Sequence, residues 1–227
     1  MSRPFRVGLT GGIASGKSTA AKLFAAHGAH VLQSDAMGRE LMEPGQAVYR
    51  KIAEHFGEGV VMPGGGLDRS ALARIAFADG RVEELNAIVH PAVIARQNEI
   101  ADEIGRREPG AVVIVESALI FESKYGGGRE GDRSGRWRRR FDRMILITAP
   151  EEVKIARFVQ RAADGREITP EQRSELVAEA YRRLAQQIPD EQKSSMCDYV
   201  LTNGGALKEL EWQVDQLWPM LKAAAAR

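Results

Sequence analysis

The sequence lacks cysteine pairs and long apolar runs. Its single cysteine, Cys197, cannot form an internal disulfide or a cysteine-based metal cluster, so the chain fits a reducing compartment. No stretch approaches the roughly 20 apolar residues that a membrane span needs. The segment before the first glycine-rich loop leaves no room for the apolar core of a secretory signal. We therefore expect a cytoplasmic protein that does not cross a membrane.

An excess of charge is also absent. The 227 residues include 32 lysines and arginines against 31 acids, which leaves a formal charge of +1. A balanced chain has no overall field that would attract nucleic acid or a lipid surface. We expect no nucleic-acid partner, and anions must be bound by local groups of residues. With 44% hydrophobic residues, the chain can bury one compact core.

The clearest motif is a phosphate loop, which reads GGIASGKST and satisfies G-x-x-x-x-G-K-[ST]. It lies between a short apolar run and a helical pattern that ends at Gly28. Glycines let backbone N–H groups converge on phosphate oxygens, and the helix N-terminus adds positive charge. Lys17 is expected to reach the β- and γ-phosphates of ATP as a catalytic residue, and Ser18 to ligate Mg²⁺. The expected cofactor-binding residues of the loop are Gly11, Gly12, Ile13, Ala14, Ser15, Gly16, Lys17, Ser18 and Thr19.

Strands and helices alternate around this loop, which predicts an α/β fold with a parallel sheet. The predicted strands are Phe5–Thr10, Ala29–Leu32, Ala111–Val115, Met144–Thr148 and Tyr199–Thr202. We expect a three-layer P-loop fold with about five strands, an inserted helical acceptor-binding subdomain and a helical lid. The predicted core comprises residues 1–36, 108–156 and 192–227, the insertion 37–107 and the lid 157–191.

Several local signals refine this organisation. Asp68 is placed to cap a helix in the insertion, and His90 with Pro91 is expected to break a pair of helices there. Thr169 opens a capping box in the lid. The glycine- and arginine-rich segment Tyr125–Arg143 could grip a polyphosphate, but its composition favours a solvated loop.

A last helix is expected from about Ala206 to Leu221, with Trp212 and Trp218 as packing residues. Its apolar residues recur at helical spacing, which indicates that one face is buried.

The phosphate loop alone does not decide the reaction. A GTPase needs D-x-x-G and N-K-x-D; Asp35–Gly38 reads D-A-M-G too soon after the loop, and N-K-x-D is absent. A motor or transporter ATPase needs a longer chain and paired acids after a strand, where only Glu116 stands. A small kinase is favoured. The alternatives are a shikimate- or gluconate-type kinase and a regulatory module that binds ATP without transferring phosphate.

Charged residues at two places could act on the transferred group. Asp35 follows the second strand, at the edge where α/β proteins bind ligands; it could accept a hydrogen bond from the attacking hydroxyl or cap a helix that starts near Met37. Arg39 would face the same cleft one turn later. Arg157 and Arg161 share a helix face, where they could stabilise charge on a moving phosphoryl group or simply be solvated.

Taken in order, the motifs resemble those of dephospho-coenzyme A kinases over nearly the whole chain. They are LTGGIASGKST at Leu9–Thr19, Asp35 with Arg39, GLDRSAL at Gly66–Leu72, LNAIVHP at Leu85–Pro91, ALIFE at Ala118–Glu122, Arg157 with Arg161, QIP at Gln187–Pro189 with Lys193, and CDYVLTNGG at Cys197–Gly205. The resemblance implies transfer of the γ-phosphoryl group of ATP to the ribose 3′-hydroxyl of dephospho-CoA, with Mg²⁺, giving CoA and ADP in the last step of coenzyme A biosynthesis.

The resemblance also implies residue roles. Asp35 would orient or deprotonate the 3′-hydroxyl, and Arg157 and Arg161 would serve the phosphates as catalytic residues. The acceptor would be surrounded by Arg39, His90, Phe121 and Glu122, and the adenine would lie near Asn203 and Gly204.

The chain departs from the family pattern at a few positions. Ala14 stands where glycine is usual in the phosphate loop, which we expect to be tolerated only if its φ is negative. Gln33 replaces the first acid of D-A-D, and Lys154 stands where glutamine is common. Ser117 and Ala118 replace an isoleucine and a proline. These departures bear on details of substrate binding rather than on the reaction type.

Overall fold

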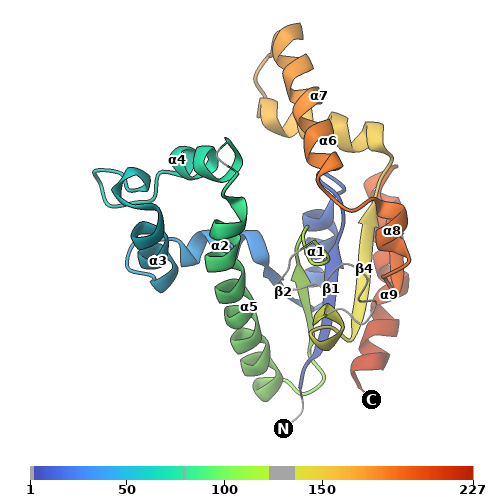
Figure 1. Cartoon of the computed structure of the whole chain (residues 1–227). Helices are drawn as coiled ribbons and strands as arrows, with labels where there is room; N and C mark the ends of the chain where they lie inside the picture. The colour runs from blue at the N-terminus through green and yellow to red at the C-terminus, as the bar shows by residue number, and fades with distance from the viewer. Residues whose placement is uncertain (1–2, 79, 123–135, 227) are drawn as a thin grey trace. The chain divides into compact units, whose positions relative to one another are not determined.

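A computed structural model describes residues 3–78, 80–122 and 136–226. The chain folds into two compact units, one comprising Met1–Leu32 with Glu103–Arg227 and the other Gln33–Asp102. Figure 1 shows the course of the chain through both. Within the described ranges, no helix is both long and apolar enough to cross a bilayer.

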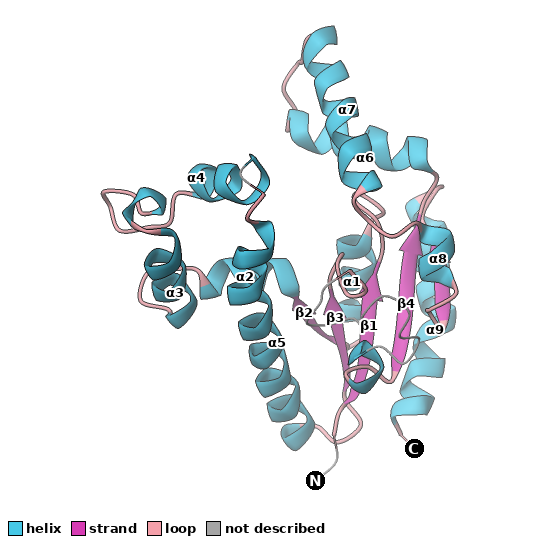
Figure 2. Ribbon diagram, in the orientation of Figure 1, coloured by secondary structure: helices cyan, strands magenta, loops and turns pink. Residues whose placement is uncertain are grey.

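The larger unit is built on a five-stranded sheet with the order β2-β3-β1-β4-β5 (Figure 2). The strands are β1 (Phe5–Thr10), β2 (His30–Gln33), β3 (Val112–Glu116), β4 (Arg143–Thr148) and β5 (Tyr199–Thr202). β1 lies at the centre and pairs in parallel with β3 and β4. β3 is buried along its whole length, as parallel strands covered on both faces are. The predicted α/β fold with about five parallel strands is confirmed.

Helices α1 (Lys17–Ala26) and α9 (Leu207–Ala225) pack against this sheet and complete its main core. The chain leaves α1 through Gly28, whose φ of +100° is the left-handed conformation that favours glycine at a helix end. α9 buries Leu210, Val214, Leu217 and Leu221, and Trp218 packs against the same core. Trp212 points away from this stripe and is 64% exposed. The expectation that it packs was therefore wrong.

A helical hairpin of α6 (Glu151–Ala163) and α7 (Pro170–Ala185) follows β4 and lies beyond the carboxyl ends of β1 and β4 (Figure 1). Its own apolar cluster contains Ile155, Phe158 and Val159. The predicted capping box is present, because Thr169 and Gln172 exchange side-chain and backbone hydrogen bonds. The short helix α8 (Asp190–Ser194) then contacts β4.

The second unit is helical. It contains α2 (Ser34–Leu41), α3 (Ala47–Phe56), α4 (Arg69–Ala73) and much of α5 (Val82–Arg107). The Asp68 carboxylate caps α4 by accepting from the N–H groups of Ser70 and Ala71 at 2.9 and 3.0 Å, as predicted. The expected break at His90 and Pro91 was wrong, since α5 runs through it. Proline removes one backbone hydrogen bond, but apolar residues of α5 on both sides of it, Leu85, Ile88, Val89 and Ala92, pack against the unit's core.

The arginine-rich segment is only partly described. Residues 123–135 lie outside the described ranges, and the rest of the segment begins with a 3₁₀ helix, Arg136–Arg139. Trp137 is buried, and its ring meets that of Phe121 edge to face at 5.1 Å. Phe141 is buried as well. The solvated-loop interpretation was thus wrong for this end of the segment, because its aromatic residues join the core.

We predict that Thr169→Ala destabilises the start of α7, since loss of an N-cap costs about 1 kcal/mol. The loss corresponds to roughly five-fold faster amide exchange in the first turn of α7, with exchange in α9 unchanged. Ser174→Ala is the control, because the Ser174 hydroxyl donates to Pro170 O and does not cap the helix. If amide exchange in α7 is unchanged in Thr169→Ala, the capping box does not stabilise the N-terminus of this helix.

Candidate nucleotide-binding and phosphoryl-transfer site

The phosphate loop leaves the carboxyl end of β1 through residues with positive φ. Gly11 and Gly16 have φ of +155° and +97°. A Cβ on Gly11 would lie 2.2 Å from Ile147 O, and one on Gly16 would lie 1.9 Å from Asn203 Nδ2. Position 16 therefore requires glycine for two reasons: its φ is positive, and Asn203 leaves no space for a Cβ. No side chain caps the N-terminus of α1, which leaves that helix end to an anion.

Ala14 corrects one expectation from the sequence. Its φ is +53°, so the negative φ that was expected to make alanine acceptable is not present. A residue with a Cβ costs about 1–2 kcal/mol in this left-handed region. The methyl group gains some compensation, because Ala14 and Ile13 pack against the apolar cluster of the α6–α7 hairpin. The loop is thus strained at one position and supported from outside.

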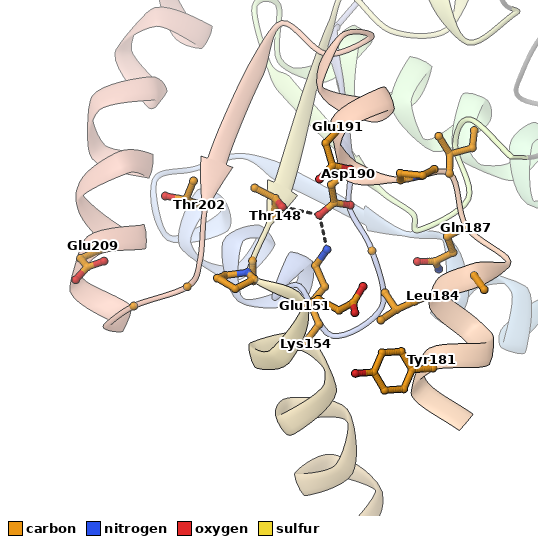
Figure 3. Close-up of a pocket in the computed structure, with 18 residues that line it drawn as sticks. Thr148, Glu151, Lys154, Tyr181, Leu184, Gln187, Asp190, Glu191, Thr202 and Glu209 are labelled. Carbon is orange, nitrogen blue, oxygen red and sulfur yellow. Dashed lines mark hydrogen bonds and ion pairs between the residues drawn. The ribbon is translucent and has the colours of Figure 1, made fainter. Parts of the chain in front are cut away.

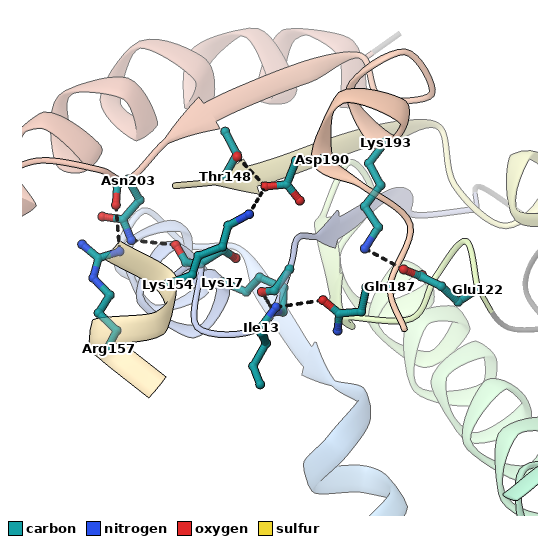
Figure 4. Close-up of polar contacts among 12 residues, drawn as sticks. Ile13, Lys17, Glu122, Thr148, Lys154, Arg157, Gln187, Asp190, Lys193 and Asn203 are labelled. Atoms are coloured by element: carbon teal, nitrogen blue, oxygen red, sulfur yellow. Dashed lines mark hydrogen bonds and ion pairs between the residues drawn. The ribbon is translucent and has the colours of Figure 1, made fainter. Parts of the chain in front are cut away.

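The two loop residues with expected chemistry both have defined partners. Lys17 Nζ donates to Gly12 O at 2.9 Å (Figure 4). Ser18 Oγ donates to Glu116 Oε1 at 2.9 Å. Glu116 ends β3 and lies opposite Leu9 of β1, which brings it to the loop. Its contact with Ser18 was missed from the sequence, where the only signal was an acid at the end of an apolar strand.

The Ser18–Glu116 pair fits a magnesium ion. A hydroxyl and a carboxylate supply the hard oxygen ligands that Mg²⁺ prefers. Among the described residues, no group of three or more His, Cys, Asp or Glu side chains could hold a metal. Mg²⁺ usually takes few protein ligands and completes its shell with phosphate oxygens and water. The small donor set is therefore the kind that a nucleotide-bound magnesium needs.

Asn203 lies against the phosphate loop. Its side chain is buried, and Nδ2 donates to Ser15 O at 2.9 Å. Arg157 NH1 donates to the backbone oxygen of Asn203 at 2.7 Å (Figure 4). Gly204 follows directly and touches Pro150, since a Cβ there would lie 2.8 Å from the proline ring. Arg161, one turn beyond Arg157 on α6, is exposed. The structure therefore joins Arg157, Asn203 and the loop, and leaves Arg161 at the surface.

A second group of polar residues borders the loop on the side of α8. Lys154 and Asp190 form a buried ion pair, and Thr148 Oγ1 also donates to the Asp190 carboxylate. They line a cavity of about 850 Å³ (Figure 3), which Gly12 of the loop also borders. Gln187 lines the same cavity, and its Oε1 accepts from Ile13 N at 2.9 Å. The lysine found in place of the usual glutamine is thus a paired cation.

Phe121 and Glu122 are engaged within the larger unit. Phe121 is buried against Trp137. Glu122 Oε1 lies 2.7 Å from the Nζ of Lys193, which is fully buried, and accepts from Ile188 N at 3.2 Å. These contacts tie the chain after α7 to the turn after β3. Contact of Phe121 and Glu122 with an acceptor stays a prediction.

The remaining candidates lie in the helical unit. α2 begins at Ser34 with Gln33 at its N-cap position, so Asp35 lies in the first turn and does not cap the helix. Arg39 is in the last turn of the same helix. Burial lowers the pKa of His90 below its ordinary value, although the nearby carboxylates of Glu83 and Asp35 oppose the shift. The structure therefore places His90 in the neighbourhood of Asp35 and favours the neutral imidazole.

The fold and the site together define a P-loop kinase, in which a parallel sheet presents the phosphate loop at its carboxyl edge, next to the α6–α7 hairpin. A family model described as dephospho-CoA kinase matches residues 5–209. The chain belongs to the dephospho-CoA kinase family.

Individual relatives agree with this assignment. Dephospho-CoA kinases from Thermobifida fusca and Corynebacterium jeikeium are 34% and 36% identical to the chain over 96% and 93% of its length, and the matches cover 96% and 97% of their own. The crystal structure of TT1252 from Thermus thermophilus superposes with a TM-score of 0.70 at 31% identity, over 97% of this chain and 99% of that one. A shikimate kinase from Bacteroides thetaiotaomicron, at 14% identity and a TM-score of 0.51 over 96% and 98% of the two chains, shares the fold.

The lowered pKa of His90 predicts a pH dependence of stability. Below about pH 6.5 the unfolded chain binds a proton at this histidine more readily than the folded protein does. Stability should therefore fall as the pH drops through this range, until the folded form is protonated too. Thermal unfolding between pH 5 and 8 should show a smaller fall for His90→Gln.

His30→Gln is the control, since His30 is a histidine of the other unit whose ring meets Glu108 at the surface. This variant should keep the fall in melting temperature. If the melting temperature of His90→Gln falls as much as that of the unaltered protein when the pH is lowered, the pH dependence belongs to other groups.

Proposed function

We propose that the chain transfers the γ-phosphoryl group of Mg²⁺-bound ATP to the ribose 3′-hydroxyl of dephospho-CoA, giving CoA and ADP in the cytoplasm. The observation that carries the proposal is the phosphate loop, with Lys17 and the Ser18–Glu116 pair, in a chain that matches the family from residue 5 to 209. The exchange of partners by Lys17, from Gly12 O to phosphate oxygens, would place its charge on the β- and γ-phosphates.

Positioning and charge stabilisation supply most of the catalysis in phosphoryl transfer. Ser18 and Glu116 would hold Mg²⁺, which would offset the negative charge of the phosphates. Arg161 is exposed on α6 and would bind the phosphates. Arg157 would serve the same end of the nucleotide while bonded to Asn203, and Gly204 would border the adenine.

The acceptor would be held by the helical unit. Asp35 lies in the first turn of α2. Its carboxylate would accept the proton of the 3′-hydroxyl as the bond to phosphorus forms. Arg39 and neutral His90 would bind the acceptor beside it. Phe121 and Glu122 would shape the acceptor site from the turn after β3.

ADP release from ATP and Mg²⁺ should be stimulated by dephospho-CoA and not by adenosine, shikimate or gluconate. A chelator should abolish the stimulation, and excess Mg²⁺ should restore it. Stimulation by shikimate or gluconate instead would move the chain to another kinase specificity. Stimulation by none of these acceptors, with ATP still bound, would favour a regulatory module.

Asp35→Asn should lower kcat by about 10²–10⁴-fold, because the amide cannot take the hydroxyl proton. The KM for ATP should change less than about two-fold, since uniform binding of the nucleotide is retained. Asp68→Asn is the matched control in the same unit, because asparagine also caps helices. Near-normal turnover of Asp35→Asn would exclude a catalytic role for this carboxylate.

A further inference from the structure

The strained residue of the phosphate loop, Ala14, is held on both sides by side-chain amides. On one side, Gln187 Oε1 accepts from Ile13 N at 2.9 Å. On the other, Asn203 Nδ2 donates to Ser15 O at 2.9 Å. Figure 4 shows both contacts reaching the loop from different segments of the chain. We refer to Gln187 and Asn203 as the amide pair.

A left-handed alanine persists only where its surroundings fix the backbone. Ile13 N belongs to the peptide group before Ile13, and Ser15 O belongs to the peptide group after Ser15. The amide pair therefore holds the two ends of the three-residue segment that has Ala14 at its centre. Without the pair, the chain at Ala14 would favour negative φ. The loop N–H groups would then lose the arrangement that converges on phosphate oxygens.

Asn203 is itself held rigidly. It is 7% exposed, its backbone N donates to Thr148 O at 2.7 Å, and Arg157 donates to its backbone oxygen. Its Nδ2 occupies the space that a Cβ on Gly16 would need. The amide therefore has little freedom to turn toward another partner, and its hydrogen-bonding capacity is directed at the loop.

Gln187 is held by its own neighbours in sequence. Three residues later, Asp190 joins the buried pair with Lys154 and the hydrogen bond from Thr148. Further on, buried Lys193 is paired with Glu122. Breaking one partner of a buried ion pair is costly, so these contacts fix the segment that presents the Gln187 amide to the loop.

We propose that Asn203 and Gln187 are positioning residues that keep the phosphate loop ready for nucleotide, and that this chain depends on them because it carries alanine at position 14. The inference rests on the proposed function in one respect, that the loop binds the phosphates of ATP. It gives Asn203 a role toward the phosphates, through Ser15, in place of contact with the adenine.

The test uses Asn203→Ala and the near-isosteric Gln187→Met, each made with Ala14 and with Ala14→Gly. Two probes separate the parts of the nucleotide: inorganic tripolyphosphate with Mg²⁺ for the loop, and adenosine for the base, each measured as a competitor of ATP. With Ala14, the tripolyphosphate affinity should fall about 5- to 30-fold, as the cost of the left-handed conformation implies. With Ala14→Gly the fall should be less than about three-fold, since glycine adopts positive φ readily.

Adenosine affinity should stay within about two-fold in every variant, and the KM for ATP should follow the tripolyphosphate affinity. Gln213→Ala is the matched control. The Gln213 amide bonds to the backbone N and O of Thr202 at 2.8 Å, next to Asn203, and has no assigned role at the phosphate loop. Its removal should leave both affinities unchanged.

Three results would overturn the proposal. Equal losses for adenosine and tripolyphosphate would assign Asn203 to the base. Equal losses with alanine and glycine at position 14 would show that the amide pair does not act through this residue. Failure of the unaltered protein to bind tripolyphosphate would remove the premise. Melting temperatures identify variants that fail to fold. If Asn203→Ala is one of them, Gln187→Met, at a half-buried position, provides the test in its place.

The proposed acceptor is tested separately from the amide pair. Tripolyphosphate binding with the expected dependence on position 14, but without stimulation of ADP release by dephospho-CoA, would support the amide pair and refute the proposed acceptor.

Discussion

The pairing of β1 with a parallel strand on either side is the constraint on which the site depends. Parallel strands end at the same edge of a sheet, and β1 is aligned so that Leu9 lies opposite both Glu116 of β3 and Ile145 of β4. The phosphate loop therefore starts between two strand ends. One supplies the carboxylate for Ser18, and the other leads to Thr148, which contacts both Asn203 and Asp190. A shift in this register would separate all of these groups at once.

Much of the architecture follows from local sequence patterns. The strand before the loop, the glycine after α1, the Asp68 cap and the Thr169 capping box each depend on a few neighbouring residues, and each was predicted. The left-handed conformation of Ala14, the continuous helix through Pro91 and the exposure of Trp212 were not. Packing decided the first two of these features, since the loop is supported from outside and the α5 residues around Pro91 belong to a core.

The contacts within the site could likewise not be predicted from local sequence patterns. Ser18 meets an acid 98 positions away, and Asn203 meets Ser15 across 188 positions. Such contacts arise from sheet order, which no local pattern specifies. The sequence could name Ser18 as a candidate from the phosphate-loop motif, and Asn203 from the resemblance to a family. It could not show that Asn203 bonds to the loop, nor that Lys154 is neutralised by Asp190.

The bond from Lys17 to Gly12 O has a consequence for how readily nucleotide enters. The ammonium group is already bound within the loop, to an acceptor that a phosphate oxygen can replace. Binding then exchanges one hydrogen bond for a stronger charged one, without ordering a mobile side chain, and so costs little entropy. The Gly12 carbonyl oxygen is the hydrogen-bond acceptor that a phosphate oxygen would replace at Lys17. The lysine therefore needs little rearrangement when a phosphate binds.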